Sequence, residues 1–556
     1  MSAGNMKSNV AVLRYLWAVS RGLRLQATLN ASIGVVVVAL DFSFIFFSKL
    51  CIDLATGKAE GYSLTAIALV LLGIILAQIV IRLGRQWISA ILGVKAQNKM
   101  QQRLFRHLLE AQWSGLEARH SGDLLNRLER DVRDVTTTIT ETIPATFTVV
   151  VRLLGAFYFL FMMSASLALA IALITPCFAL LSRIYVSRMR KITRKIRQTD
   201  SEIQSLMQES VQHSMVLKTL EQVPQMLTSL GRAQSTLQDQ VRRRTRFSSA
   251  SGALINFGFT LSYLAAFLWG VNGLQEQTIT YGMMTAFLQL VGQIQGPFRD
   301  ILRFVPSMIS TLTAGERLME IEEAPIEQQG EPLRIAGGAG IRITNVCYTY
   351  PGGHRRILDN LSCDFPPGSH TAILGETGAG KTTLIRLILA LTSPQQGSVE
   401  LYNNEGRSIK ASPLTRCNIV YVPQANTLFC GTIRSNLLMG NPRATEQEMR
   451  EALHQACADF VFQLDEGLDT RCGENGNGLS EGQNQRICIA RALLRGGNIL
   501  LLDEASSALD TQTEVQLLGN LQAWMKPNQT LLFITHRPGV LKICERQLHI
   551  HRTTNP

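Results

Sequence analysis

A phosphate-binding loop is the strongest chemical signal in the sequence. Residues 375–382 read Gly375-Glu376-Thr377-Gly378-Ala379-Gly380-Lys381-Thr382, after the apolar run 371–374 and before a helical run that begins at Thr383. In such a strand–loop–helix unit, glycines let backbone N–H groups approach phosphates, and the helix N-terminus adds positive potential. We therefore expect residues 375–383 to bind a nucleoside triphosphate, with Lys381 at the outer phosphates and Thr382 on Mg²⁺.

Two carboxylates later in the chain could complete this chemistry. Asp503 and Glu504 follow the run Ile499-Leu500-Leu501-Leu502, which is typical of a buried parallel strand. Beside a phosphate loop, an Asp at the end of such a strand suits a metal link, and the next Glu suits activation of water. A strand ending in Asp-Glu is weak evidence alone, so the pair gains its meaning from the loop.

A helix start between these two features has the form of an anion site. In Leu479-Ser480-Glu481-Gly482-Gln483, Ser480 can cap a helix over Glu481–Arg495, and Gln483 can complete a capping box. A capped N-terminus that exposes Ser and Gly can also bind an anion. Taken alone, a helix start of this kind is more often structural than functional.

The elements that carry these motifs belong to one part of the chain. Composition changes after Ile321, and the stretches 322–325 and 337–340 bracket a polar linker. Beyond it, short β-rich runs alternate with helical runs, which predicts an α/β domain with a largely parallel sheet. The expected division is therefore a first domain over 1–320, a linker over 321–340 and the phosphate-loop domain over 341–556.

The first domain is predicted to be a membrane α-helical domain. Six apolar stretches, each near the ~20 residues that a spanning helix needs, lie at 27–50, 64–91, twice within 139–184 with a break at 163–166, at 252–271 and at 281–309. Only 17% of the chain is charged, which also favours partial burial in lipid. The segments between stretches have few Gly or Pro, so the helices should extend out of the membrane, and 10–20 reads as a short interfacial helix.

The basic residues are placed as topology requires. The net charge is +12, with ten Lys and Arg in 82–136 and thirteen in 183–246. The positive-inside rule then puts the N-terminus, both long inner segments and the C-terminus in the cytoplasm. This placement accounts for the basic excess and argues against nucleic-acid binding.

Taken together, the motifs resemble those of ATP-binding cassette (ABC) proteins. The stretch LSEGQ is similar to the family signature, and the other family motifs follow in order. By this resemblance Tyr350 stacks on adenine, Gln424 is the Q-loop glutamine that contacts Mg²⁺, and Gly473-Glu474-Asn475-Gly476 meets the membrane domain. Asp510 lies in the D-loop, His536 is the switch histidine at the γ-phosphate, and Ser480, Gly482 and Gln483 reach a partner's ATP. The catalytic set implied is Glu504, His536, Lys381 and Gln424, and the metal set is Thr382, Gln424 and Asp503.

The membrane half resembles the exporter branch of the family, in which six spans precede the cassette in one polypeptide. His120–Leu128 and Val216–Leu220 resemble the two coupling regions, and Ala314-Gly315-Glu316-Arg317 resembles the exit from the sixth span. The signature departs from the pattern at Glu481, where glycine is commonest, and at Asn484, where a basic residue is usual. Glu481 would lie near a γ-phosphate, which puts the hydrolysis rate in doubt.

The resemblance implies a half-transporter that works as a dimer, uses ATP and Mg²⁺, and exports an amphipathic solute such as a lipid, drug or peptide. A homodimer is favoured and a heterodimer is allowed. Two alternatives stay open: an importer of exporter shape, as in siderophore systems, and an ATP-gated regulator or channel. The intact Glu504 and His536 argue against the second alternative. A half-size chain with short outer loops suits a bacterial inner membrane.

Ionisable groups within the apolar stretches allow two interpretations. Arg152 and Asp41 lie deep in the third and first stretches, and Gln289 and Gln293 share one face of the sixth, followed by Arg299, Asp300 and Arg303. Such groups usually face a cavity or each other. They form either a polar lining for the solute or structural ion pairs.

Overall fold

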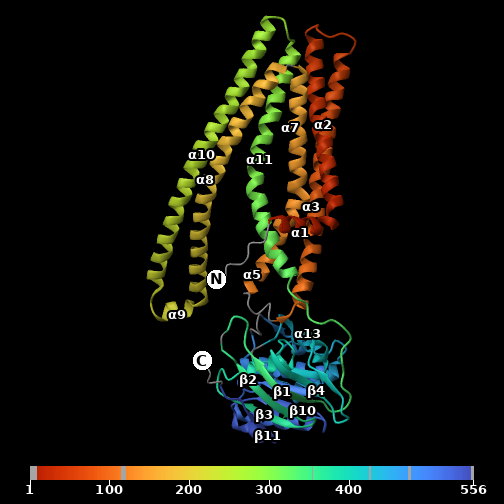
Figure 1. The fold of residues 1–556 in the computed structure, drawn as a ribbon, viewed down its shortest axis with the longest axis vertical. Coiled ribbons are helices and arrows are strands. Elements are labelled where there is room, and N and C mark those ends of the chain that lie inside the picture. The colour runs from red at the N-terminus through yellow and green to blue at the C-terminus, as the bar shows by residue number, and fades with distance from the viewer. Residues whose placement is uncertain are drawn as a thin grey trace. The chain divides into compact units, whose positions relative to one another are not determined.

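The computed structural model describes residues 9–113, 121–163, 165–353, 355–424, 427–473 and 478–552. Contacts divide the chain into two compact units: Met1–Arg106 with Ser121–Glu323, and His107–His120 with Ala324–Pro556. The first unit is helical and the second combines helices with sheets (Figure 1). The sequence did not predict that the end of the second long helix groups with the second unit.

Long helices make up the first unit, joined by short ones. Their bounds are α1 (Asn9–Val19), η1 (Ser20–Gly22), α2 (Arg24–Ala55), α3 (Leu64–Glu110), α5 (Ser121–Asn126), η2 (Arg127–Asp131), α6 (Val132–Thr137), η3 (Thr138–Thr142), α7 (Ile143–Met163), α8 (Ala165–Gln212), α9 (Ser214–Thr219), α10 (Val223–Gln275) and α11 (Tyr281–Glu322). Segments η2 and η3 are π-helical turns inside the run from α5 to α7. The six apolar stretches predicted from the sequence fall in α2, α3, α7, α8, α10 and α11.

Within the described residues, four helical segments are long and apolar enough to cross a membrane: Arg24–Ala55, Leu64–Glu110, Gly122–Met163 and Val223–Gln275. They contain the first, second, third and fifth predicted stretches. The fourth and sixth lie in α8 and α11, where the side chains of 166–187 and 298–303 fall outside the description. Helix α11 runs unbroken past Pro297 and Pro306, and α8 lies beside α10 with α9 joining them (Figure 1).

Small residues let the membrane helices approach closely. A Cβ added at Gly34 of α2 would lie 2.2 Å from Thr148 Oγ1 of α7, and one at Gly155 of α7 would lie 2.5 Å from the Phe42 ring of α2. In lipid, no hydrophobic force drives helices together, so their association depends on close packing between backbones. These contacts set the register between α2 and α7.

That register brings opposite charges together. Asp41 of α2, whose side chain is 10% exposed, accepts a hydrogen bond at 3.0 Å from Arg152 of α7 and another at 3.0 Å from Arg82 of α3. Gln78 of α3 donates to the same carboxylate at 3.2 Å. The sequence allowed either a polar lining for the solute or structural ion pairs. The structure shows that Arg152 and Asp41 form an ion pair. The side chains of Arg299, Asp300 and Arg303 lie outside the described residues.

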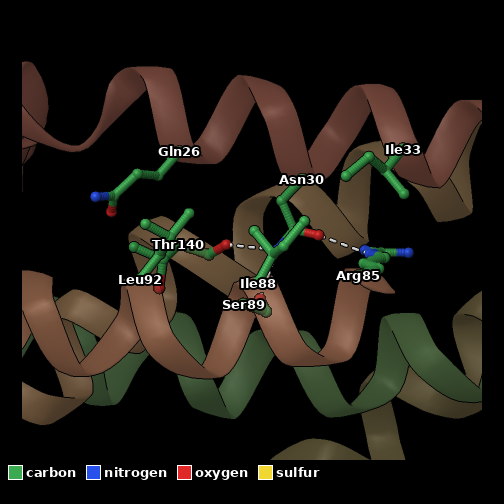
Figure 2. A pocket seen from close by; sticks show the side chains of 8 residues that line it. All are labelled: Gln26, Asn30, Ile33, Arg85, Ile88, Ser89, Leu92 and Thr140. Carbon is green, nitrogen blue, oxygen red and sulfur yellow. Dashed lines mark hydrogen bonds between the residues drawn. The ribbon is translucent and has the colours of Figure 1, made fainter. Parts of the chain in front are cut away.

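A second polar contact lines a small pocket between α2, α3 and η3 (Figure 2). Asn30 donates to Ser89 Oγ at 3.0 Å and to the Thr140 carbonyl at 2.9 Å, and it accepts from Arg85 Nε at 2.6 Å. Thr140 lies in the π-helical turn η3. A π-turn disturbs the regular ladder of helical hydrogen bonds, and the Asn30 amide gives one of its carbonyls a partner.

Two sheets form the second unit. A parallel sheet has the order β11-β3-β10-β9-β6, and an antiparallel sheet has the order β2-β1-β4-β5. The strands are β1 (Gly340–Tyr348), β2 (Leu358–Phe365), β3 (His370–Leu374), β4 (Gln396–Tyr402), β5 (Ser408–Lys410), β6 (Ile419–Val422), β9 (Ile499–Asp503), β10 (Thr530–Ile534) and β11 (Arg546–His549), with a short ribbon of β7 (Gly431–Thr432) and β8 (Arg471–Cys472). The sequence predicted a parallel sheet, and the antiparallel sheet is an addition to it.

Helices cover the parallel sheet. They are α12 (Lys381–Ile388), α13 (Ile433–Leu438), α14 (Glu446–Gln455), α15 (Glu481–Arg495), α16 (Thr511–Trp524) and α17 (Pro538–Leu541), with the short 3₁₀ segments η4 (Pro413–Asn418), η5 (Asp459–Gln463) and η6 (Gly467–Asp469). Strands β9 and β10 are buried along their whole length. Their two faces contribute to two separate hydrophobic cores, so the middle of the sheet is held from both sides.

The linker is tied to its own unit by specific contacts. Glu327 accepts two hydrogen bonds from Arg416, at 2.6 and 2.8 Å, and Arg416 also donates to the carbonyls of Leu389 and Ala390 after α12. The Glu327 N–H donates to the Glu110 carbonyl at 2.8 Å, and Ala111 forms a β-bridge with Ile326. These bonds explain why the segment from His107 groups with the second unit.

Candidate nucleotide site

The phosphate loop leaves β3 and enters α12 as the sequence predicted. Gly380 caps α12 with φ +102°, a conformation that side chains other than glycine rarely adopt. A Cβ at Gly375 would lie 2.5 Å from the Ile550 carbonyl, so the start of the loop also requires glycine. The loop therefore presents backbone N–H groups at the N-terminus of an eight-residue helix.

Three parallel strands bring the remaining groups to the same edge. In β10, Ile534 pairs with Ile373 of β3 on one side and with Asp503 of β9 on the other. Carboxyl ends of neighbouring parallel strands meet at one edge of a sheet, so the phosphate loop, Glu504 and His536 leave the sheet together.

The side chains at this edge contact one another. Lys381 Nζ donates to the Gly375 carbonyl and lies 2.9 Å from His536 Nε2. Gln424 Nε2 donates to Glu504 Oε2 at 2.7 Å, and Glu504 Oε1 lies 3.8 Å from His536 Nε2. The structure thus brings together all four residues that the sequence assigned to catalysis.

Glu504 is held in an uncommon backbone conformation. Its φ is +48°, in the left-handed region that costs roughly 1–2 kcal/mol for a residue with a Cβ. Its N–H donates to the Ile534 carbonyl at 2.9 Å, and its own carbonyl accepts from Gln485 Nε2 at 3.0 Å. The neighbouring strand and the buried amide therefore fix the turn that carries the carboxylate out of β9.

Asp503 is buried at the end of β9, and its residue is 6% exposed. Burial raises the pKa of its carboxyl to about 6, with a smaller contribution from the charge of Glu504. The Tyr421 hydroxyl lies 3.5 Å from Asp503 Oδ2 and Lys381 is nearby, and both oppose that rise. Together with the Thr382 hydroxyl and the Gln424 amide, this carboxylate offers the oxygen ligands that Mg²⁺ prefers.

Tyr350 lies beside the first turn of α12. Its hydroxyl is 3.1 Å from Thr383 Oγ1 and accepts a hydrogen bond from Arg386 at 2.8 Å. The rings of Tyr348 and Tyr350 pack edge to face, with their centroids 5.1 Å apart. Tyr348 is buried, and its hydroxyl accepts a hydrogen bond from the Thr392 hydroxyl. Of the two tyrosines, Tyr350 is the more accessible, as its proposed contact with adenine requires.

The signature forms the capping box expected from the sequence. Ser480 Oγ accepts from the Gln483 N–H at 3.2 Å, and the Gln483 side chain accepts from the Ser480 N–H at 2.8 Å, at the start of α15. A Cβ at Gly482 would lie 2.8 Å from the Ala508 carbonyl, and Asp510 caps α16. Between described residues, no hydrogen bond joins the signature to the phosphate loop.

The two coupling regions are described in part. His120 and 474–477 lie outside the described residues. In the first region Arg127, with an 11% exposed side chain, pairs with Asp123 at 2.8 Å and with Glu320 of α11 at 2.7 Å. In the second, Met215 and Val216 of α9 and Leu220 just after it are large apolar residues exposed at the turn between α8 and α10.

Several positioning residues had no signal in the sequence. Gln485 of α15 bridges the Glu504 carbonyl and the Ala508 N–H, the latter at 3.2 Å. Arg537 donates to the carbonyls of Ser507 and Leu509. Arg491 donates to Thr427, just after the Q-loop. These side chains tie the loops of the site to α15 and β10, and no residue pattern marks them.

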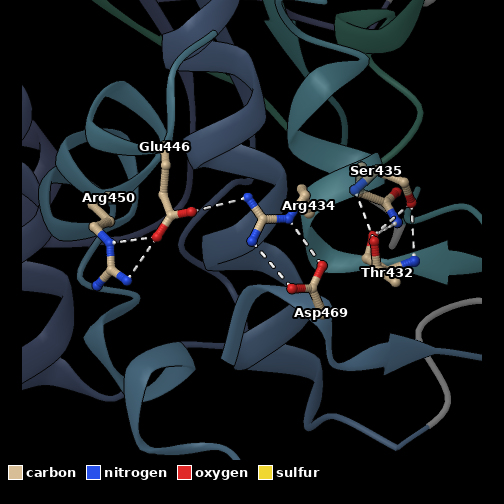
Figure 3. A network of polar contacts seen from close by, with 7 residues as sticks. Thr432, Arg434, Ser435, Glu446, Arg450 and Asp469 are labelled. Atoms are coloured by element: carbon tan, nitrogen blue, oxygen red, sulfur yellow. Dashed lines mark hydrogen bonds and ion pairs between the residues drawn. The ribbon is translucent and has the colours of Figure 1, made fainter. Parts of the chain in front are cut away.

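A separate polar network stabilises the helical part of the unit (Figure 3). Arg434 of α13 bonds Asp469 through two nitrogens, at 2.9 and 3.1 Å, and Glu446 at 3.3 Å, while Glu446 also accepts from Arg450. The hydrogen bonds from Arg434 hold the pKa of Asp469 below its usual value. Asp469 and Glu446 are half exposed or more, so solvent weakens these pairs.

Two family models match the chain. The one described as ABC transporter transmembrane region matches residues 29–298, and the one described as ABC transporter matches residues 358–507. A solved bacterial Atm1-family ABC exporter with ATP bound has the same fold, with a TM-score of 0.81, 22% identity, and coverage of 96% of this chain and 94% of that one.

Curated relatives cover most of the chain. An ATP-dependent lipid A-core flippase of Pseudomonas fluorescens is 30% identical over 79% of this chain and 73% of its own length. The uncharacterized ABC transporter ATP-binding protein y4gM of Sinorhizobium fredii is 31% identical over 81% and 78%. The ABC multidrug transporter mdr2 of Aspergillus fumigatus is 28% identical over 87% of this chain, and the match spans 61% of that longer relative.

Replacing Gln485 with Met should slow turnover without weakening ATP binding. The change removes the amide that joins Glu504 to Ala508, and we expect kcat for ATP to fall about tenfold, which is ~1.4 kcal/mol, with KM nearly unchanged. Steady-state ATPase assays measure both constants. Gln447→Met, on the exposed face of α14, is the matched control, and an unchanged kcat for Gln485→Met would contradict the assigned role.

Replacing Asp503 with Asn should stabilise the nucleotide-free chain above pH 6. The folded pKa of about 6 exceeds the ordinary pKa of an Asp side chain, about 3.9, so the folded state binds the proton more tightly. Ionisation therefore lowers stability as pH rises through this window. We expect the Tm of the variant to exceed that of the parent by a few degrees at pH 7.5 and by less at pH 5, by scanning fluorimetry with EDTA.

The control for this experiment is Asp510→Asn. Hydrogen bonds from the Thr513 backbone and hydroxyl lower the pKa of Asp510, so its ionised form favours the folded state. That variant should lose stability at pH 7.5 rather than gain it. A Tm difference for Asp503→Asn that is negative, or equal at both pH values, would contradict the burial cost assigned to Asp503.

Proposed function

Because this chain belongs to the ABC transporter family and joins an exporter-type transmembrane region to the family's ATPase domain, we propose that it is one subunit of a dimeric pump. In this proposal, ATP hydrolysis drives an amphipathic solute out of the cell by alternating access. The observation that supports it best is the meeting of Lys381, Gln424, Glu504 and His536 at one sheet edge. Because the same chain carries a multi-pass membrane unit, ATP hydrolysis can be coupled to movement of a solute across the membrane.

The roles at the site follow from chemistry and position. Lys381 and the N–H groups of 375–383 bind the phosphates of ATP. Glu504 orients the attacking water and accepts its proton, and Gln424, bonded to it at 2.7 Å, holds the carboxylate in place. His536 donates to the γ-phosphate as negative charge develops. Tyr350 contacts the adenine from the side of α12.

Mg²⁺ fits the ligands that the site presents. The Thr382 hydroxyl, the Gln424 amide and the Asp503 carboxylate are hard oxygen donors at the end of the sheet. When bound, Mg²⁺ would neutralise charge on the phosphates. Burial raises the pKa of Asp503, so ionising this carboxylate is costly, and a bound cation would offset part of that cost.

The signature requires a second subunit. Ser480 bonds Gln483 in its own helix, and among described residues nothing from the signature bonds the phosphate loop. We infer a head-to-tail dimer in which Ser480, Gly482 and Gln483 meet the γ-phosphate held by a partner, with Asp510 near the same interface. A homodimer satisfies this arrangement because the chain carries every motif, although the partner can also be a different half-transporter.

The membrane unit favours a solute with an anionic head. Arg82 and Arg152 both donate hydrogen bonds to a single carboxylate, Asp41, while Arg85 donates to the neutral amide of Asn30. Two guanidinium groups on one carboxylate, with a third on a neutral amide, leave positive charge in excess where charge is costly, and an anion would offset that cost. The relatives include a lipid A-core flippase and a multidrug transporter, which agrees with an amphipathic solute.

The expected location is the inner membrane of a bacterium, with both termini in the cytoplasm. The basic segments 82–136 and 183–246 support this orientation. The exporter direction then moves the solute from the leaflet or compartment on the cassette side to the opposite side.

The proposal is tested in vesicles that carry the chain with its cassettes outside. ATP with Mg²⁺ should move fluorescent (NBD) phosphatidic acid from the outer, cassette-side leaflet to the inner leaflet, which protects it from dithionite. NBD-phosphatidylcholine should move more slowly. Glu504→Gln should keep ATP binding but lower turnover by about 10²-fold or more, since it removes the base that orients water.

Other outcomes identify the alternatives. Movement in the opposite direction would show an importer of exporter shape. Movement that ATP supports equally well in Glu504→Gln would show an ATP-gated pathway. ATP turnover in Glu504→Gln at the parent rate would contradict the role assigned to this glutamate.

A further inference from the structure

We propose that the turn between α1 and α2 binds the phosphate of an anionic phospholipid from the cassette-side leaflet. The site consists of Arg21, Arg24 and Trp17 on this turn and Lys99 on α3. It belongs to the helical unit, whereas the nucleotide site belongs to the second unit, and it lies at the start of α2, many residues before Asp41. Its occupant would be a bound lipid of the membrane rather than the transported solute.

The start of the chain has an unusual charge distribution. Residues 1–40 contain Lys7, Arg14, Arg21 and Arg24 and no acidic residue. Arg14 and Arg21 are exposed. An acid-free basic segment beside a membrane attracts anionic headgroups.

The fold adds a third basic group to the site from a distant part of the sequence. Lys99 Nζ of α3 lies 3.8 Å from the point where a Cβ would stand on Gly22. Among the described residues, neither Arg21 nor Lys99 has a hydrogen-bond or ion-pair partner. Two positive groups without partners therefore flank the turn.

Arg24 is held in place by its own segment. Its Nη2 donates to the Trp17 carbonyl at 3.0 Å, its Nε lies 3.3 Å from Ser20 Oγ, and its guanidinium lies 4.0 Å from the centre of the Trp17 ring. Ser20 Oγ in turn donates to the Trp17 carbonyl at 2.8 Å. A guanidinium has five N–H groups, so donors remain for a phosphate at a position fixed before binding.

The surface beside these charges is apolar. Val12 and Leu16 pack against α11 at Gly315, which fixes one face of α1 inside the unit. Leu13 and Trp17 of α1 are exposed, as is Leu25 at the start of α2, which is 82% exposed. Basic groups next to exposed Trp and Leu match a phosphate next to acyl chains, and a soluble phosphate or an acidic protein would not use the apolar part.

The test measures lipid retention by native mass spectrometry of the full chain in Glu504→Gln, where turnover is blocked. The probe is palmitoyl-oleoyl phosphatidylglycerol at 30 mol% in phosphatidylcholine nanodiscs. We expect selective retention of phosphatidylglycerol, and a loss of at least threefold in the variant Arg21→Gln/Arg24→Gln/Lys99→Gln. A single change, Gly22→Glu, should give the same loss, because it places a carboxylate beside Lys99 without removing a native contact.

Two controls separate this site from other basic surfaces. Arg194→Gln/Lys195→Gln/Arg197→Gln removes the same charge from exposed positions of α8, and Arg152→Gln disturbs the cluster at Asp41; both should retain the lipid. Inorganic phosphate should not compete with it. Equal retention in the Arg21/Arg24/Lys99 variant and the parent, or an equal loss in the α8 control, would overturn the proposal.

Discussion

Parallel pairing of β3, β10 and β9 is the constraint on which the nucleotide site depends. The strands are buried from both sides, and their register places Ile373, Ile534 and Asp503 side by side. Loops that leave such a ladder at its carboxyl edge have to meet, which is why Glu504 joins Lys381 and His536, two residues that lie 155 positions apart in the chain. Shifting the register of β9 by one residue would turn each of its side chains, Asp503 included, to the other face of the sheet.

The membrane unit is subject to a different constraint: lipid supplies no hydrogen-bond partner, so each polar group needs a partner within the protein. Close approach of α2 and α7 at Gly34 and Gly155 sets a register that pairs Asp41 with Arg152. The Asn30 amide gives a partner to a carbonyl in the π-helical turn η3. Polar contacts of this kind join α3 and α7 to α2, with two guanidinium groups on the one carboxylate of Asp41.

Much of this arrangement could be predicted from the sequence, where local pattern decides the structure. The phosphate loop, the buried strand at Ile499, the capping box at Ser480 and the helix Glu481–Arg495 follow from neighbouring residues, and the structure confirms each. The pairing of Arg152 with Asp41, the π-helical turns, the bridging amide of Gln485 and the antiparallel sheet could not be predicted. They depend on the register between distant segments, which composition and spacing do not encode.

The central claim is that each cassette holds half of a catalytic site, with the phosphate loop of one chain facing the signature of another. Mixing two inactive chains, Lys381→Ala and Ser480→Arg, tests it most directly through ATPase activity after co-expression. In the mixed dimer, one site combines the intact loop of the Ser480→Arg chain with the intact signature of the Lys381→Ala chain. The account predicts that activity returns in the mixture, while each variant alone stays inactive. A mixture as inactive as its components would contradict the shared site.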